Sequence, residues 1–506
     1  MGEEGELIKT VNLTKVYPDG TVALKGVDFD VQKGEIHGLL GENGAGKTTL
    51  TKILSGILKP TAGEIHVRNE KVTMKRPQDG LALGIGMVHQ HFALVRRFTA
   101  FENIVLGTKV NPAGRKADTT KKQIEDLSSR LGLKVPLDEL VENLSLGVQQ
   151  RVEIIKMLYR NVDLLILDEP TSSLTPTESD ELFKTLKKLK NEGRGIIFIT
   201  HKLREVMENC DRITVLRQGQ VSGRTDAGQV DPRTLARMMV GRDVVLELSR
   251  PPFSPGDVIL AVRELTVLNN SGEEVVEQVS LSVRRGEIFG IAGVEGNGQT
   301  ELAEAISGVK PLAKGQISLA GNDISHASPN LVRRSGAALI PEDRRFMGLV
   351  TEMTVAENTI LGKQREKQFR SGYFTIAWKK VNNFTNSLIA RFGIVTQGPK
   401  SVVKSMSGGN QQKLVVSREL SSEPDFILAS QPTRGLDVAS TEYMRKLLLQ
   451  LRGANKGVLL ISSDLDEIFQ LADTIGVMYE GKLIDVVSSE GLTRDKIGLL
   501  MGGVKE

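Results

Sequence analysis

A glycine-rich segment near the N-terminus ends in lysine and threonine and could hold phosphate groups. Residues 41–48 read Gly-Glu-Asn-Gly-Ala-Gly-Lys-Thr, a complete G-x-x-x-x-G-K-T phosphate loop, with an apolar run at 36–40 before it. Bare glycines let backbone N–H groups close on phosphate oxygens, while the lysine supplies charge and the threonine a hydroxyl for Mg²⁺. The segment predicts a phosphate site formed by Gly41, Glu42, Asn43, Gly44, Ala45, Gly46, Lys47, Thr48 and Thr49.

Two adjacent carboxylates follow the apolar run at 164–167. Asp168 is suited to hold Mg²⁺ through water, and Glu169 is suited to act as the general base that polarises an attacking water. The alternative is an acidic strand end that caps the next helix.

Three further polar residues lie where they could complete such a site. Gln90 follows the buried run 85–88 and could reach both magnesium and the attacking water. His201 follows the run 196–200 and could hydrogen-bond the γ-phosphate, although a lone histidine is more often structural. Tyr17 precedes the loop and could stack on an adenine ring, but it is equally plausible as a core residue.

The whole series recurs in the second half of the chain with altered chemistry. Residues 293–300 repeat the loop at an offset of 252 residues (41 to 293), with Gln299 in place of the lysine and Thr300 retained. A second anion-binding pattern, Ser407-Gly408-Gly409-Asn410-Gln411-Gln412, places bare glycines at the start of a helix. Its counterpart begins Ser145-Leu146-Gly147, and Leu146 would obstruct a phosphate.

These residues must be positioned by alternating strands and helices. The apolar runs at 164–167, 196–199 and 458–461 are continuous, which favours strands buried on both faces of a parallel sheet. Helical patterns at 177–190 and 441–452 lie between them. The repeats predict one domain at 1–245, a short Pro-rich linker at 246–257 and a second domain at 258–506.

Composition excludes several classes of protein. The 506 residues are 40% hydrophobic, 25% charged and only 4% aromatic, with a net charge of +4 that is spread along the chain. This disfavours a nucleic-acid surface. The single cysteine, Cys210, excludes an internal disulfide and a cysteine-built zinc site. The acidic N-terminus lacks a signal-peptide pattern, and no apolar run is long enough to span a membrane.

In this order, the motifs resemble those of the ATP-binding cassette (ABC) family over essentially the whole chain, twice. The resemblance implies an α/β fold of tandem P-loop domains, each with a mainly parallel sheet, an antiparallel β subdomain and a helical subdomain, the latter at about 91–160 and 343–418. It also implies ATP and Mg²⁺ as cofactors. In that family two cassettes face head to tail, and each ATP lies between the P-loop of one and the signature segment of the other.

That arrangement separates intact from altered positions. One composite site would contain Lys47, Thr48, Gln90, Asp168, Glu169 and His201, together with Ser407, Gly408, Gly409, Gln411 and Asp437. The other would contain Gln299, Thr300, Glu342, Ser430, Gln431 and Ser463, with Leu146 in its signature and Thr175 where Asp437 stands. All the losses fall in the second set, so we expect one hydrolytic site and one inert site.

The fused arrangement resembles the ATPases of sugar and nucleoside importers, and the segment 87–94, with His91 after Gln90, is more similar to the nucleoside branch. The resemblance implies two permease subunits, an external substrate-binding protein, no nucleic acid, and a peripheral location at the cytoplasmic face of the cell membrane. The alternative is a soluble tandem ABC ATPase acting on ribosomes. Such proteins typically keep both sites intact.

Overall fold

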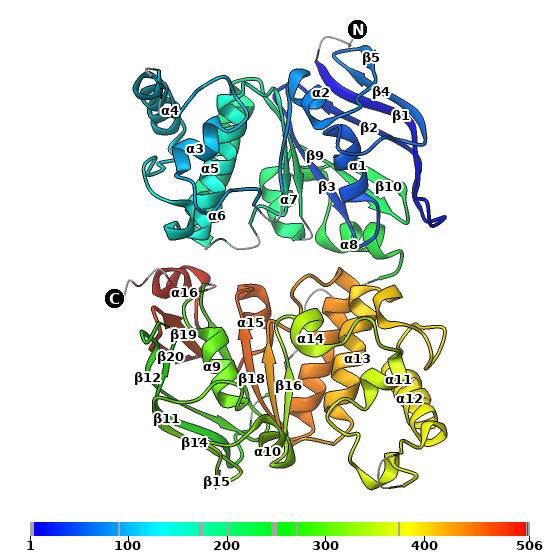
Figure 1. The fold of residues 1–506 in the computed structure, drawn as a ribbon, viewed down its shortest axis with the longest axis vertical. Helices are drawn as coiled ribbons and strands as arrows, with labels where there is room; N and C mark the ends of the chain where they lie inside the picture. Colours follow the sequence, from blue (N-terminus) through cyan, green and yellow to red (C-terminus); the bar gives the residue numbers. More distant parts are fainter. Residues whose placement is uncertain are drawn as a thin grey trace. The chain divides into compact units, whose positions relative to one another are not determined.

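The computed structural model describes residues 5–501 and 503, except 90, 91, 113, 115, 172, 173, 175, 201, 244–249, 253, 270, 295, 373 and 374. Contacts divide the chain into two compact units, Met1–Leu246 and Glu247–Glu506. Each unit contains a mainly parallel sheet, an antiparallel sheet and a group of helices (Figure 1). The predicted fold class is confirmed.

The parallel sheet of the first unit places the ends of its central strands close together. Its order is β10-β9-β3-β8-β7-β6, and all neighbours are parallel except the β10–β9 pair. The strands are β3 (Ile36–Gly41), β6 (Ile85–Val88), β7 (Leu164–Asp168), β8 (Gly195–Ile199), β9 (Arg212–Arg217) and β10 (Gln220–Asp226). Because β3, β8 and β7 are neighbours, the phosphate loop and the carboxylate pair start from the same edge of the sheet.

An antiparallel sheet and helices complete the first unit. The sheet order is β2-β1-β4-β5, with β1 (Glu6–Val16), β2 (Val22–Gln32), β4 (Ala62–Val67) and β5 (Glu70–Val72). The helices are α1 (Lys47–Leu54), α2 (Pro77–Ala82), α3 (Ala100–Val105), α4 (Ala117–Leu131), α5 (Leu146–Tyr159), α6 (Pro176–Asn191), α7 (Leu203–Asn209) and α8 (Pro232–Val240), with 3-10 turns at Val141–Asn143 and Ala227–Gln229. Both α3 and α4 pack on α5 as a helical group.

The second unit repeats this plan. Its sheets are ordered β16-β17-β18-β13-β19-β20 and β12-β11-β14-β15. The strands are β11 (Val258–Leu268), β12 (Glu274–Arg284), β13 (Ile288–Ala292), β14 (Lys314–Leu319), β15 (Asn322–Asp323), β16 (Ala337–Ile340), β17 (Phe426–Ser430), β18 (Gly457–Ser462), β19 (Thr474–Tyr479) and β20 (Lys482–Ser488). The α-helices are α9 (Gln299–Ile306), α10 (Pro329–Arg334), α11 (Val355–Thr359), α12 (Trp378–Phe392), α13 (Gly408–Leu420), α14 (Val438–Gly453), α15 (Leu465–Leu471) and α16 (Arg494–Met501).

Shorter helical turns lie at Lys367–Phe369 and Val403–Ser405, and a π-helical turn lies at Arg344–Gly348. Within the part of the chain described, no helix combines the length and apolar character needed to cross a bilayer.

Burial on both faces explains why the core strands are continuously apolar. In β13, Phe289 and Ile291 belong to the core beneath the antiparallel sheet, whereas Ile288 and Ala292 belong to the core beneath the helices. A polar residue on either face would lose its water without gaining a partner. The prediction of doubly buried parallel strands is confirmed.

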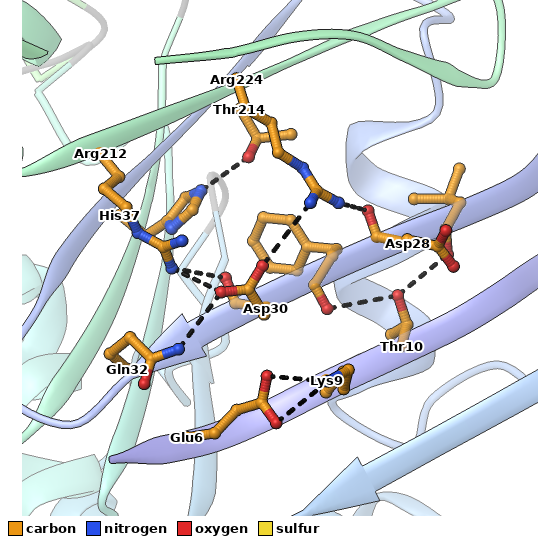
Figure 2. A network of polar contacts seen from close by, with 12 residues as sticks. Glu6, Lys9, Thr10, Asp28, Asp30, Gln32, His37, Arg212, Thr214 and Arg224 are labelled. Atoms are coloured by element: carbon orange, nitrogen blue, oxygen red, sulfur yellow. Dashed lines mark hydrogen bonds and ion pairs between the residues drawn. The ribbon is translucent and has the colours of Figure 1, made fainter. Parts of the chain in front are cut away.

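A buried polar network fixes the antiparallel sheet of the first unit to strand β3. Glu35 accepts hydrogen bonds from Arg212 Nε (2.7 Å) and lies 2.9 Å from His37 Nδ1. Arg212 also binds Asp30, and the other ring nitrogen of His37 lies 2.8 Å from Thr214 Oγ1 (Figure 2). Burial alone raises the pKa of Glu35, but the bonds from His37 and Arg212 outweigh it and lower that pKa to about 2. The network therefore holds the strand that leads into the phosphate loop.

We expect Glu35→Gln to destabilise the first unit at pH 7 by about 2–3 kcal/mol. The folded-state pKa of Glu35 lies below its ordinary value of 4.5, so its charge stabilises the fold above pH 4.5. The difference from wild type should fade between pH 4.5 and 2, as measured by scanning calorimetry. Glu287→Gln is the matched control. Burial raises the pKa of Glu287, so its charge opposes folding and its removal should not destabilise the second unit at pH 7. Equal losses from both variants would contradict this account.

Candidate functional site

The first phosphate loop connects β3 directly to α1. Gly46 caps α1 with φ of 106°, and a Cβ added there would lie 2.7 Å from the Ala23 carbonyl oxygen. Only glycine fits this left-handed, crowded position. Gly44 also has positive φ (81°). The loop backbone therefore has the open, turned form that lets successive N–H groups converge on an anion.

Lys47 is held over this loop rather than extended into solvent. Its side chain is buried, and Nζ donates to the carbonyl oxygens of Gly41 (2.6 Å) and Glu42 (3.1 Å). A phosphate entering the loop would meet this charge in a partly desolvated place. Tyr17 lies beside the same helix, with its Oη 3.2 Å from Thr49 Oγ1. The structure thus brings Tyr17 to the loop, and it does not test adenine stacking.

The carboxylate pair stands at the end of β7. Glu169 adopts a left-handed backbone conformation (φ 49°), and its N–H donates to the Ile199 carbonyl oxygen on the neighbouring strand (2.9 Å). Burial and the adjacent Glu169 charge raise the pKa of Asp168 to about 6, while Lys47 and Lys52 lower it. The pair thus concentrates negative charge that a cation would stabilise.

The oxygen donors of the first unit suit a hard cation. Thr48 presents an exposed hydroxyl at the start of α1, and Asp168 supplies a carboxylate. Among the described residues, no cluster of three His, Cys, Asp or Glu side chains could hold a metal by itself. An ion here would take much of its coordination from phosphate and water, as Mg²⁺ does in nucleotide sites.

The second phosphate loop keeps the backbone and loses the charge. Gly298 caps α9 with φ of 93°, as Gly46 does for α1. Gln299 is buried like Lys47, and its Nε2 donates to the Val294 carbonyl oxygen at 3.0 Å. Val294 is the counterpart of Glu42 at the offset of 252. The amide has therefore replaced the ammonium in place, and the loop lacks the positive charge that Lys47 supplies in the first unit.

The other altered side chains of the second unit bind one another. Thr300 Oγ1 donates to Glu342 (3.1 Å), and Glu342 is also paired with Arg434. The side-chain oxygen of Gln431 accepts from both the N–H and the hydroxyl of Ser463, each at 3.2 Å. In the second unit, these side chains therefore bind one another. Their counterparts in the first unit are the groups expected to face the metal, the water and the γ-phosphate.

Restoring the lysine alone should not restore activity. We expect Gln299→Lys, made in a Lys47→Ala background, to hydrolyse ATP at less than about 1% of the wild-type rate, since the general base it lacks is worth at least about 100-fold. Ser430, Gln431 and Ser463 would still lack metal, base and γ-phosphate functions. Steady-state phosphate release measures this. Recovery to a tenth of wild-type activity would show that the lysine was the only missing group.

The two signature helices differ at their first turn. In α5, Ser145 accepts a hydrogen bond from the Val148 N–H, and Leu146 follows with 38% of its surface exposed. In α13, the Ser407 hydroxyl caps none of the described helix amides and accepts instead from Asn410 Nδ2 (2.9 Å). The start of α13 therefore offers backbone N–H groups and a hydroxyl to an anion. Asp437 caps α14, accepting from Ser440 N–H at 2.7 Å.

The side chain of Gln411, a predicted ATP contact, is buried in its own unit. Gln411 is only 2% exposed, and its Nε2 donates to the carbonyl oxygens of Val403 and Met406 (both 3.2 Å). The side chain supports the turn before the signature, and its contact with ATP stays a prediction. Gly409 packs tightly, since an added Cβ would lie 2.1 Å from Ser440 Oγ. Gln90, His91, Thr175 and His201 lie outside the described residues.

Sequence reasoning gave no role to Arg344, whose guanidinium lies against the signature. A Cβ added at Gly408 would lie 2.7 Å from Arg344 Nη2. A signal was present, because the repeat offset of 252 at Glu342 becomes 255 at Thr354, the counterpart of Thr99. The two threonines are equivalent because each caps its helix, α3 or α11, with the same Thr-x-x-Glu capping box. Three residues are therefore gained just before the second helical group.

Comparison with known sequences places this geometry in a family. Residues 24–172 and 276–434 each match the family described as ABC transporter. The chain is 45% identical to the nucleoside import ATP-binding protein NupA of Lactococcus lactis subsp. cremoris, covering 98% of both chains. It is 43% identical to the guanosine import ATP-binding protein NupO of Bacillus subtilis (98% and 97% covered) and 42% identical to the glucose import ATP-binding protein TsgD13 of Haloferax volcanii (98% and 96% covered).

Among solved structures, one titled RNase-L Inhibitor superposes with a TM-score of 0.63, covering 97% of this chain and 93% of that one. Its sequence identity is 20%, so the likeness concerns the fold alone. Three observations agree on the family. The family model matches twice, each match contains a phosphate loop, and the relatives span nearly the full length. The chain belongs to the ABC transporter family and is an ATPase of that family with two ABC-type domains.

Proposed function

We propose that the chain is the energy-coupling ATPase of a solute importer, with one hydrolytic and one inert nucleotide site. The observation that carries this is the segregation of chemistry between the repeats. Lys47, Asp168 and Glu169 stand together in the first unit, whereas the matching positions of the second hold neutral side chains. Similarity to import ATP-binding proteins of 42–45% identity supports the import role.

The hydrolytic site would combine the first phosphate loop with the second signature. ATP would bind with its phosphates on residues 41–48. Mg²⁺ would be held by the Thr48 hydroxyl and, through water, by the Asp168 carboxylate, with Gln90 as the expected third group. Glu169 takes the proton of the attacking water, and His201 is the expected contact to the γ-phosphate. Ser407, Gly408 and Gly409 stabilise the γ-phosphate from the other side. The substitution pattern supports this pairing.

The pairing predicts unequal effects of matched substitutions. Gly408→Asp would place a carboxylate against the γ-phosphate, so hydrolysis should fall at least about 100-fold through like-charge repulsion and steric block. Leu146→Asp adds the same charge to the other signature and should change the rate less than about twofold, because that site contributes no turnover. Steady-state ATPase assays of the two purified variants compare them. Equal losses would refute the assignment of the α13 signature to the hydrolytic site.

A groove in the second unit suits a permease segment. A cavity of about 330 Å³ is bounded by α9, α10 and the π-helical turn, with Ile306, Val332 and Met347 among its lining residues. Beside it, Leu331 is 52% and Phe346 is 92% exposed. An apolar groove with exposed apolar side chains next to its lining residues is the kind of contiguous patch that marks an interaction surface. We assign them to a cytoplasmic segment of a membrane permease, which import ATP-binding proteins require as a partner.

Cross-linking tests the docking surface. In a Cys210→Ser background, Phe346→Cys should form a cross-link to the co-expressed permease in membranes. Val395→Cys is the matched control. Phe346 directly precedes Met347, which lines the groove, whereas Val395 is 74% exposed on the same unit and neither it nor its chain neighbours line the groove. Equal cross-linking from both positions, or none from Phe346→Cys, would rule out this surface.

Nucleosides are the proposed cargo. Two of the three relatives compared above are named for nucleoside or guanosine import, including the one with 45% identity, and the third is named for glucose import. An external binding protein would deliver the solute, because the ATPase itself stays at the cytoplasmic face as a peripheral subunit. The ATPase can be reconstituted with the permeases and the binding protein encoded by the genes beside its own. The ATPase activity of that complex should rise with nucleoside-loaded binding protein. Stimulation by a sugar-loaded protein only would make the cargo a sugar.

The competing function is a tandem ABC ATPase that acts on ribosomes. A solved structure of an archaeal ribosome recycling factor shares the fold at a TM-score of 0.61, but its 19% identity carries no functional argument. Fractionation distinguishes the two functions. The importer subunit should sediment with membranes and be released when the permeases are absent, whereas a ribosomal factor should follow the ribosome pellet.

A further inference from the structure

The second unit contains a helical turn that the first unit lacks in sequence. Between Glu342 and Val350 there are three more residues than between their counterparts Gln90 and Val95. Val95 and Val350 are equivalent because each donates its N–H to the asparagine of the following helix, Asn103 or Asn358, at 2.8 and 2.9 Å. The segment that gains these three residues contains the five-residue π-helical turn Arg344–Gly348, capped by Asp343. Such insertions are common at functional sites.

This turn places the Arg344 guanidinium over the first turn of α13. Nη1 donates to the Arg434 carbonyl oxygen (3.1 Å), and Nη2 lies 2.7 Å from the position a Cβ of Gly408 would take. Nε is buried without a hydrogen-bond partner among the described residues. Burial lowers the pKa of Arg344, yet a guanidinium remains charged at neutral pH. A fixed positive charge therefore stands at the signature.

The position is unfavourable unless an anion is bound. A helix N-terminus carries a partial positive charge, so a cation beside it is destabilising. Among the described residues, Arg344 forms no ion pair with a carboxylate, although the more distant charges of Asp343 and Asp437 help to stabilise it. A phosphate bound at the α13 amides beside the Arg344 Nη atoms would offset the partial charge of the helix end and the charge of the arginine together.

The first unit shows the opposite combination. Its signature has Leu146 where α13 has Gly408, and its segment after Gln90 is three residues shorter, with Phe92 in the place of Arg344. The arginine and the glycine thus occur together in one repeat and are absent together from the other. The repeat that has both is the one whose signature serves the proposed hydrolytic site.

We propose that Arg344 contacts the γ-phosphate of the ATP that is held by the first phosphate loop. The second unit would thus contribute a charged side chain to the hydrolytic site in addition to its signature. This inference rests on the proposed function. Its contact would form as the signature meets the nucleotide and would discriminate ATP from ADP, which has no γ-phosphate.

Conservative substitutions separate charge from structure. Arg344→Gln keeps a polar donor on a shorter and neutral side chain, and Arg344→Lys keeps the charge. In the purified full-length protein, Arg344→Gln should lower kcat/KM for ATP about 10- to 100-fold, the scale of one charged hydrogen bond to phosphate. The Ki of ADP as a competitive inhibitor should change less than twofold. Arg344→Lys should recover part of the loss, and the neighbouring exposed Arg345→Gln should behave as wild type.

Each outcome decides the inference. Equal weakening of ATP and ADP, unchanged kcat/KM in Arg344→Gln, or an equal loss in Arg344→Lys would each refute a charged γ-phosphate contact. Circular dichroism shows whether Arg344→Gln has a folding defect. If it has one, Arg344→Lys alone tests the proposed contact, through its effect on kcat/KM for ATP relative to its effect on the Ki of ADP. Lys47→Ala keeps the two hypotheses apart. If that variant remains active, the proposed hydrolytic site is wrong, whereas its inactivity beside a normal Arg344→Gln refutes only the role of Arg344.

Discussion

A Lys47→Ala variant is expected to lose ATP hydrolysis almost completely, by at least about 1,000-fold, the scale of a lost charged group at a transferring phosphoryl group. The lysine is buried over its loop, with Nζ on the carbonyls of Gly41 and Glu42. Alanine removes the charge and leaves those carbonyls without this donor. Phosphate release by the purified variant at saturating MgATP measures the effect.

The matched control is Gln299→Ala, which truncates the buried residue at the same place in the second loop. Its rate should stay within about twofold of wild type, since distant sites act independently. Substantial hydrolysis by Lys47→Ala, or an equal loss in Gln299→Ala, would move the active site away from the first loop.

Glu169→Gln should slow hydrolysis by at least about 100-fold while leaving ATP binding within about twofold of wild type. Glutamine keeps the size and hydrogen-bonding reach of the side chain but cannot accept a proton. Its backbone should be tolerated, because Gln431 already occupies the equivalent left-handed position in the second unit with φ of 46°. Rapid-quench measurement of single-turnover hydrolysis, beside equilibrium binding of ATP, separates the two steps.

Gln431→Glu, the reverse change in the second unit, is the control and should leave the rate unchanged. Normal turnover by Glu169→Gln with normal binding would make Glu169 a structural residue. Weakened binding together with slow turnover would instead indicate that the strand end had been disturbed.

The phosphate loop and the parallel strands were predictable because their signals are local. A strand buried on both faces must be apolar along its length, and residues 36–40 and 164–167 show this directly. The fixed spacing from Gly41 to Thr48 likewise leaves few backbone arrangements that could hold phosphate.

The inward side chain of Gln411 and the contact of Arg344 with the signature were not predictable, for different reasons. The three-residue gain marks the segment that contains Arg344 but does not show what its guanidinium contacts. Gln411 stands among motif residues, but at its position α13 turns the side chain inward, onto the carbonyls of Val403 and Met406. Arg344 meets the signature only through the π-helical turn, whose path depends on tertiary packing. Membership of a motif says little about which face of a helix a residue occupies.

The bend after strand β7, where Glu169 stands, has a counterpart after strand β17 of the second unit. Glu169 and Gln431 share the same left-handed backbone, and each gives its N–H to the adjoining strand, at Ile199 and Ile461 (2.9 and 2.7 Å). The half whose side chains lack the base thus preserves the bend unchanged. The unusual conformation is therefore a property of how the sheet ends, already present whether or not chemistry takes place there. The bend therefore does not depend on the catalytic side chain that it carries in the first unit.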